Sequence, residues 1–355
     1  MKRVIAFADR SSAAALWVLA LVNMLFFAAI VATLLSLSGN AHAATAACKG
    51  ADMLAEIKAD RPATYAQMQA DAAAVTNGSG LLWKIEKAGL EPSFLFGTMH
   101  MTDPRVVNLP ENAQASFETA GTIVIETTDV LDPQKMAASM LTSPELMMFT
   151  DATTMKSLLS PDDLVIVEKG LADRGISLSA VNKMKPWMLA SMVALPACEL
   201  ARKAEGAAIL DVNLANEAKA DGKEIGGLET AKSQLEAMAS LPIEFHVEGL
   251  VDTIKLGDKA EDVTETMIII YQSGETGLFI PFMRAAVPTE KTGDAGYAEF
   301  EEKMITARNV IMANNAEPYL AKGKAFIAVG ALHLPGEEGV IEKLRRAGYT
   351  VTRAD

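Results

Sequence analysis

The sequence FLFGTMH at residues 94–100 and the sequence FIAVGALH at residues 326–333 decide the fold of this chain. Each is a short apolar run that ends in Gly-x-x-His (GxxH), a pattern typical of a buried strand followed by a sharp turn. Each histidine therefore follows the carboxyl end of a strand, and ligands of open α/β sheets gather at that edge. We predict that the fold brings His100 and His333 together. The alternative is that the two motifs are unrelated turns.

Both motifs are followed by the same series of features: Leu-Pro, a helical stretch, Ala-Gly and a second strand. The series ends at Glu126 after the first motif and at Arg353 after the second. We interpret this as two degenerate strand–GxxH–helix–strand units in the central mixed sheet of an α/β fold. Residues 132–272 between them show helical periodicity interrupted by Pro and Gly, which predicts a large, mainly helical insertion.

The N-terminal segment has the features of an export signal. A basic start precedes an almost wholly apolar run at residues 13–37, and Ala-His-Ala at residues 41–43 is typical of a signal-peptidase site. The apolar run is also long enough to span a bilayer, so an uncleaved inner-membrane anchor is the alternative. In either case we predict an exported periplasmic or cell-envelope domain at residues 44–355, with residues 1–43 outside the fold.

Charge and cysteine content agree with that setting. The formal charge is −13, and residues 1–43 contribute +2, which leaves −15 for the remainder. Such a surface repels phosphate backbones, so nucleic acid is excluded as a partner, and membrane contact is expected only through the N-terminal segment. The chain has two cysteines, and an oxidising compartment favours a Cys48–Cys198 disulfide over two free thiols.

The residues that end the strands suggest metal chemistry. Two neutral imidazoles, His100 and His333, and the carboxylate of Glu126 form a three-ligand set that leaves positions for water and substrate, as catalytic metal sites do. No HExxH, GxSxG, Walker or Rossmann glycine motif is present. Arg308, on a predicted helix at residues 297–319, is a candidate for holding a carboxylate or an oxyanion, the alternative being a surface salt bridge.

Further motifs extend the pattern beyond the two histidines. With the GxxH motifs, they resemble the TraB/GumN family, in particular its GumN-like branch, which is related to the Tiki metalloproteases. The resemblance covers about residues 80 to 353. The motifs are LWKI at 82–85, GLET at 227–230 with Gln234, Arg308-Asn309 with Met312, and VGALHLPG at 329–336.

The resemblance implies an α/β fold of the Tiki and erythromycin-esterase type and a hydrolase that uses a divalent metal ion (Mn, Co or Zn) to cleave peptide bonds. It places the metal on His100, Glu126 and His333. Glu126, Arg308 and Asn309 are the implied catalytic residues, although some relatives have an acid where this chain has Asn309. We therefore expect a metal-dependent envelope peptidase with a peptide or protein substrate. The alternative is a non-catalytic envelope protein that sequesters a peptide or glycan.

Overall fold

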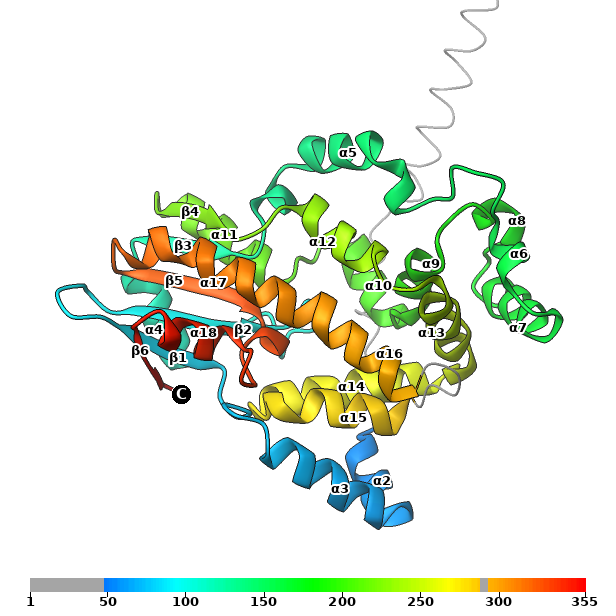
Figure 1. Ribbon diagram of the computed structural model, residues 1–355, viewed down its shortest axis with the longest axis horizontal. Helices are drawn as coiled ribbons and strands as arrows, with labels where there is room; N and C mark the ends of the chain where they lie inside the picture. Colours follow the sequence, from blue (N-terminus) through cyan, green and yellow to red (C-terminus); the bar gives the residue numbers. More distant parts are fainter. Residues whose placement is uncertain (1–47, 288–292) are drawn as a thin grey trace, which may run out of the picture. The chain divides into compact units, whose positions relative to one another are not determined.

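The two strands that carry the GxxH motifs are direct neighbours in the sheet. In the computed structural model, which describes residues 48–287 and 293–355, β2 (Ser93–Thr98) and β5 (Ala325–Gly330) pair in parallel (Figure 1). Their register aligns Thr98 with Gly330. Because parallel strands in register end at the same edge, both motifs leave the sheet side by side. The prediction that the fold brings the two motifs together is confirmed.

The sheet is mixed and has six strands within the described residues, in the order β4-β3-β5-β2-β1-β6. The strands β4, β3, β5 and β2 run parallel, whereas β1 is antiparallel to both of its neighbours. An α/β fold with a central mixed sheet is thus confirmed. The remaining strands are β1 (Leu82–Glu86), β3 (Thr122–Ile125), β4 (Glu224–Gly227) and β6 (Thr350–Arg353).

The strand arrangement does not establish two equivalent units. The second strand of the first series, β3, pairs with β5, whereas the second strand of the other series, β6, pairs with β1. In addition, β4 is a strand within the stretch predicted to be mainly helical. It was missed because it has only four residues, two of them glycines, which have low strand propensity.

Helices cover both faces of the sheet. On one face, Phe96 and Phe326 pack against Phe117 of α4. On the other face, Leu95 and Ile327 belong to a second hydrophobic cluster that includes residues of α17 and α18. The helices before the long insertion are α2 (Met53–Asp60), α3 (Pro62–Ala73) and α4 (Glu111–Thr119), and those after it are η3 (Thr276–Leu278), α15 (Phe279–Ala286), α16 (Gly293–Phe300), the π-helix η4 (Glu301–Thr306), α17 (Ala307–Leu320), η5 (Ala331–His333) and α18 (Val340–Arg346).

The stretch at residues 132–272 is mostly helical, apart from β4. Its helices start at sequence signals: Ser160 caps α7 with Pro161 in the first turn, and Thr230 forms a capping box at α12. A third hydrophobic cluster holds α7, α9 and α13 together. The helices, with the turn η1 (Thr128–Leu131) before them, are α5 (Pro133–Thr142), η2 (Pro144–Leu146), α6 (Met155–Leu158), α7 (Pro161–Ala172), α8 (Leu178–Val181), α9 (Pro186–Ala194), α10 (Ala197–Ala204), α11 (Leu210–Ala220), α12 (Ala231–Ala239), α13 (Ile243–Leu256) and α14 (Lys259–Gln272).

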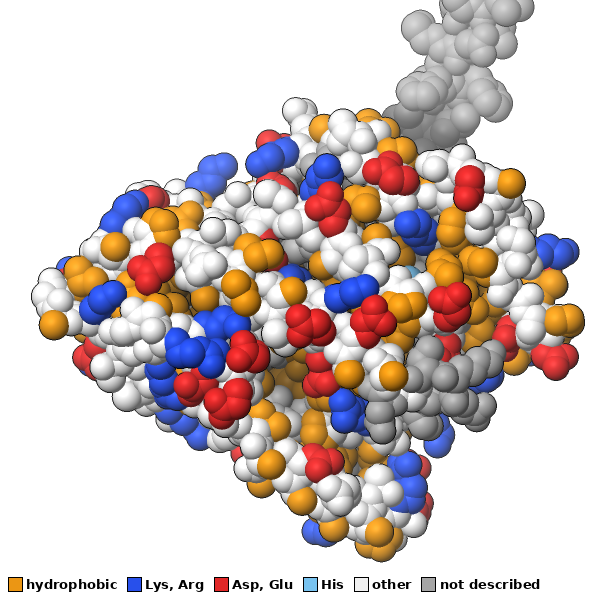
Figure 2. Space-filling model, viewed as in Figure 1, with side chains coloured by type: hydrophobic (Ala, Val, Ile, Leu, Met, Phe, Trp, Pro, Cys, Tyr) orange, Lys and Arg blue, Asp and Glu red, His pale blue; other side chains and the backbone are white. Residues whose placement is uncertain are grey.

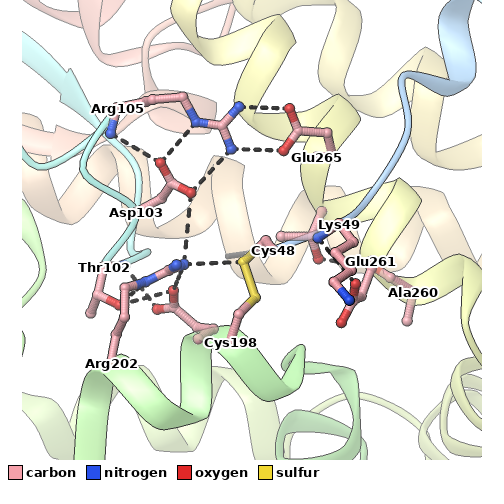
Figure 3. The surroundings of a disulfide bond; sticks show 12 residues. Cys48, Lys49, Thr102, Asp103, Arg105, Cys198, Arg202, Ala260, Glu261 and Glu265 are labelled. Carbon is pink, nitrogen blue, oxygen red and sulfur yellow. Dashed lines mark hydrogen bonds and ion pairs between the residues drawn. A yellow bond between two sulfur atoms is a disulfide. The ribbon is translucent and has the colours of Figure 1, made fainter. Parts of the chain in front are cut away.

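A disulfide bond joins Cys48 to Cys198, as predicted (Figure 3). Cys198 lies in the first turn of α10, where its neighbour Glu199 is fully buried. The Glu199 carboxylate accepts a hydrogen bond from the backbone N–H of Thr102 at 2.8 Å and another from Arg202 Nη2 at 2.9 Å. The bridge therefore attaches Cys48 to α10, and Glu199 attaches the loop after the first GxxH motif to the same helix.

The predicted export segment, residues 1–43, and the predicted anchor within it, residues 13–37, lie outside the described residues. Within residues 48–287 and 293–355, no helix combines the length and apolar character needed to cross a bilayer.

Candidate functional site

The second histidine, His333, is buried and held in one tautomer. It ends the short helix η5, and its Nδ1–H donates to Asn309 Oδ1 at 2.7 Å. The Asn309 amide is itself oriented, because its Nδ2 donates to the carbonyl of Glu338 at 2.9 Å. Burial lowers the pKa of His333 to about 4, although the nearby Glu126 carboxylate opposes this shift. At neutral pH the ring is therefore uncharged, with the Nε2 lone pair facing the site.

Glu126, directly after β3, is the acid of the site. Its Oε1 accepts a hydrogen bond from the backbone N–H of Gly330 at 2.7 Å. Its Oε2 accepts hydrogen bonds from Arg308 at 2.8 Å and from Gln234 at 2.9 Å. Burial would raise the pKa of Glu126, but the two imidazoles and Arg308 outweigh it and lower the pKa to about 2. His333 Nε2 lies 3.8 Å from Oε1. Glu126 is thus a fixed carboxylate beside a neutral imidazole.

Arg308 is buried on α17 and serves as the counter-ion of two acids. Its Nη2 donates to Glu229 Oε2 at 2.7 Å as well as to Glu126. Its Nη1 donates to the carbonyl of Met304 at 3.2 Å. Arg308 therefore forms a buried ion pair, not a surface salt bridge, and its predicted catalytic role stays a prediction. Its buried guanidinium balances the charge of the site.

The first histidine, His100, has a different environment. Half of its side-chain surface is exposed, and its Nε2 lies 3.6 Å from Oδ1 of Asp211, a buried acid in the first turn of α11. The same oxygen accepts the Thr98 hydroxyl at 3.2 Å. Desolvation lowers the pKa of His100, but Asp211 and Glu126 more than offset this and raise it to about 9. Without a metal, the two imidazoles therefore differ: His333 is neutral at neutral pH, whereas the pKa of His100 is raised.

The glycines of the two motifs allow this close packing. A Cβ on Gly97 would lie 2.7 Å from Leu334 Cδ1 and 3.1 Å from the Cα of Ala331, both in the turn after β5. A Cβ on Gly330 would lie 3.2 Å from Glu126 Oε1, the atom to which the Gly330 N–H donates. Each motif therefore has glycine because another part of the site passes directly over it.

One cavity of about 250 Å³ collects the candidate residues. His100, Glu126, Arg308 and His333 all line it. Asn309 does not line this cavity, and it contacts His333 through the Nδ1 atom of the ring. Three residues of the site were not predicted to act there: Asp211, Glu229 and Gln234. GLET and Gln234 were noted only as part of the family resemblance, and Asp211 lies in a helical stretch without a motif.

The sequence of this chain is similar to that of known proteins. A family model, the TraB/PrgY/gumN family, matches residues 81–353. The chain belongs to the TraB/PrgY/gumN family. Among curated relatives, Metalloprotease TIKI2 of Danio rerio is 25% identical over 77% of this chain and 60% of its own length. Metalloprotease TIKI1 of Homo sapiens is 24% identical over 78% of this chain and 62% of its own length.

This TraB/PrgY/gumN chain therefore spans about three-fifths of the length of the curated relatives it matches. No solved structure gives a significant match to it. The erythromycin-esterase-like description of the fold thus stays a prediction.

The site suits a metal ion in its donor chemistry. His333 Nε2 has a free lone pair, and Glu126 Oε1 accepts one hydrogen bond and can accept another. His100 is protonated at neutral pH, so binding through it would release a proton. Within the described part of the chain, no three His, Cys, Asp or Glu side chains are grouped closely enough to hold a metal ion. The predicted ligand set therefore stays a prediction.

Proposed function

We propose that this protein is a metal-dependent peptidase of the cell envelope, with a divalent ion (Mn, Co or Zn) held by His100, Glu126 and His333. The observation that carries the proposal is the neutral His333 imidazole, whose Nε2 faces Glu126 in a cavity. The names of the relatives, metalloproteases, support the reaction class. The disulfide and the N-terminal sequence support an oxidising envelope compartment.

The residues have separate tasks in this proposal. Asn309 fixes the tautomer of His333, and burial keeps that ring neutral. Arg308 and the Gly330 N–H fix the position of Glu126, whose low pKa keeps it a carboxylate that can bind a cation. When bound, the metal lowers the pKa of a water molecule and polarises the substrate carbonyl.

Metal analysis combined with peptide hydrolysis tests the proposal. The purified protein is loaded with Mn, Co or Zn, its metal content is measured, and hydrolysis of a peptide library is followed with and without a chelator. We expect about one metal ion per chain and turnover that the chelator abolishes. Stoichiometric peptide or glycan binding without metal or turnover would instead support a sequestering protein.

Glu126→Gln separates the two roles open to that residue. Loss of metal marks Glu126 as a ligand, whereas retained metal with lost turnover marks it as a general base. Glu229→Gln is the matched control, because the Glu229 side chain is buried and pairs with the same Arg308 but does not line the cavity. We expect this control to keep both metal and turnover. Equal losses in both variants would mean that only the charge balance of Arg308 matters.

A further inference from the structure

The cavity beside the two histidines has apolar walls. We propose that it binds a large apolar side chain, such as Leu, Met or Phe, of the residue next to the cleaved peptide bond. The proposal rests on the proposed peptidase function and adds its substrate class. The apolar side chains that form the walls are Met99, Met267, Phe279, Phe300, Met304, Ile305 and Leu332.

The apolar walls begin directly at the histidines. Met99 precedes His100 in the first motif, and Leu332 precedes His333 in the second. Both side chains line the cavity, and both are only partly buried. A substrate side chain that contacts them therefore lies within one residue of each imidazole, so the backbone of that residue is next to the candidate catalytic groups.

The charged groups of the cavity already have partners. Arg308 pairs with Glu126 and Glu229, and His100 lies beside Asp211. Among the described residues that line the cavity, Glu126 and Arg308 are the only Asp, Glu, Lys or Arg side chains. A Lys, Arg, Asp or Glu side chain of the substrate would lose its hydration without gaining a counter-ion. The site therefore discriminates against charged side chains at this position.

The cavity favours a class of apolar side chains over one residue. Three of its wall residues are methionines, whose unbranched side chains adapt to differently shaped ligands. Met304 and Ile305 lie on the π-helix η4, and π-helical turns are frequent at functional sites. Met304 is also tied to the site through its carbonyl, which accepts a hydrogen bond from Arg308. We therefore expect Leu, Met and Phe to be accepted with similar efficiency.

A second cavity gives the rest of a peptide room. It measures about 600 Å³ and shares Ile305 and Leu332 with the first cavity. Its other lining residues include polar ones such as Arg284 and Glu337. Figure 2 shows the surface hollowed between α17 and α15, with hydrophobic side chains at the bottom of the hollow. This arrangement fits a peptide whose apolar side chain occupies the first cavity and whose chain continues into the second.

A library of end-blocked decapeptides tests the proposal on the complete protein. Mass spectrometry of the products gives the residues on each side of every cleaved bond. We expect Leu, Met and Phe on one side, with charged residues disfavoured by roughly tenfold or more in kcat/KM. Cleavage that shows no apolar preference on either side would overturn the substrate class and leave the proposed peptidase function intact.

A charge placed in the cavity wall sharpens the test. Met304→Glu should lower kcat/KM for a Leu peptide by roughly tenfold or more and raise it for the matching Lys peptide. Ile311→Glu is the control, because Ile311 is 43% exposed on the neighbouring α17 and does not line the cavity. Circular dichroism verifies that both variants are folded. An unchanged preference in folded Met304→Glu would contradict the proposal.

Absence of any cleavage would count against the peptidase function, and binding then decides the substrate class. The probes are N-acetyl-leucine amide, N-acetyl-phenylalanine amide and N-acetyl-lysine amide, titrated into the wild type and Met304→Glu by calorimetry. Preferential binding of the apolar probes that Met304→Glu abolishes would support the apolar cavity. Equal binding of all three probes, or no binding, would overturn it.

Discussion

The two GxxH turns have the same motif and leave neighbouring strands in register, yet their histidines differ in charge. His100 is half exposed and faces the Asp211 carboxylate, which raises its pKa to about 9. His333 is buried and faces the Asn309 amide, and its pKa falls to about 4. The motif therefore sets the path of the backbone, whereas the Asp211 carboxylate raises the pKa of His100 and burial lowers the pKa of His333.

Removing either ring is expected to have the largest effect. We expect His100→Ala and His333→Ala each to abolish bound metal and turnover, because each variant removes a proposed metal ligand. Stability should separate them. His333→Ala leaves the buried Asn309 oxygen without its donor, which costs about 1–3 kcal/mol, whereas the exposed His100 pair contributes less than about 1 kcal/mol. Urea unfolding measures both, and equal stability losses would contradict the comparison.

The two rings should also give opposite pH dependences of stability. The folded pKa of His333, about 4, is below the unfolded value of 6.5, so its contribution is complete above pH 6.5 and is lost as pH falls towards 4. The loss is on the order of 3 kcal/mol. The raised pKa of His100 means that its contribution is present below pH 6.5 and is lost as pH rises through about 9.

Unfolding free energies between pH 4 and 9, measured with a chelator present, test these signs. His333→Gln should reduce the slope on the acid side, where buried His246 with a pKa of about 4 also contributes, and His100→Gln should flatten the alkaline side. The Glu126 carboxylate does not interfere, because its contribution is lost only as pH falls from 4.5 towards about 2. If His333→Gln keeps the wild-type slope between pH 4 and 6.5, the assignment of a buried neutral ring is wrong.

Exchanging the partners of the rings should exchange their properties. Asn309→Asp puts a carboxylate on His333 Nδ1 and should raise the pKa of that ring, whereas Asp211→Asn should lower the pKa of His100 towards 6.5. Asn309→Ala removes the orienting acceptor and should weaken metal binding by about 10–100-fold. NMR titration of the histidines and equilibrium metal binding report both effects. Unmoved pKa values would show that the partners do not control the rings.

The smallest effect is expected from Thr98→Val. It removes the 3.2 Å hydrogen bond to Asp211 Oδ1, which contributes about 1 kcal/mol. Turnover should fall severalfold because the partner of His100 is held less firmly. Thr122→Val is the control. The Thr122 hydroxyl donates a hydrogen bond to Glu224 in β4, and neither residue lines the cavity. A larger loss of turnover in the control would show that Thr98 has no special link to the site.

The sequence indicated the positions of the main candidates because local patterns mark them. Apolar runs that end at Gly-x-x-His predict buried strands, and parallel pairing of β2 and β5 then brings the histidines to one edge. His100, Glu126, Arg308 and His333 do line one cavity, while their roles as ligands or catalysts stay predictions. The Cys48–Cys198 disulfide was predictable because the N-terminal sequence predicts export to an oxidising compartment and two cysteines have one possible pairing.

The charge states and the partners were not predictable in this way. Asp211 reaches His100 only because α11 packs against the sheet, and its segment has no motif that indicates this contact. Likewise, burial of His333 depends on the packing around η5, which periodicity does not report. The strand β4 was missed because Gly226 and Gly227 give it a weak strand signal, although pairing with β3 stabilises it.

The disulfide also changes the covalent connectivity of the chain. Cys48 and Cys198 are 150 positions apart, so the bond closes a ring that contains the first GxxH motif and Glu126. A single backbone nick inside that ring opens it without releasing a fragment, and the two pieces separate only after reduction. In a compartment where proteases meet folded proteins, a nicked molecule would therefore keep His100 and Glu126 attached to the strand that carries His333.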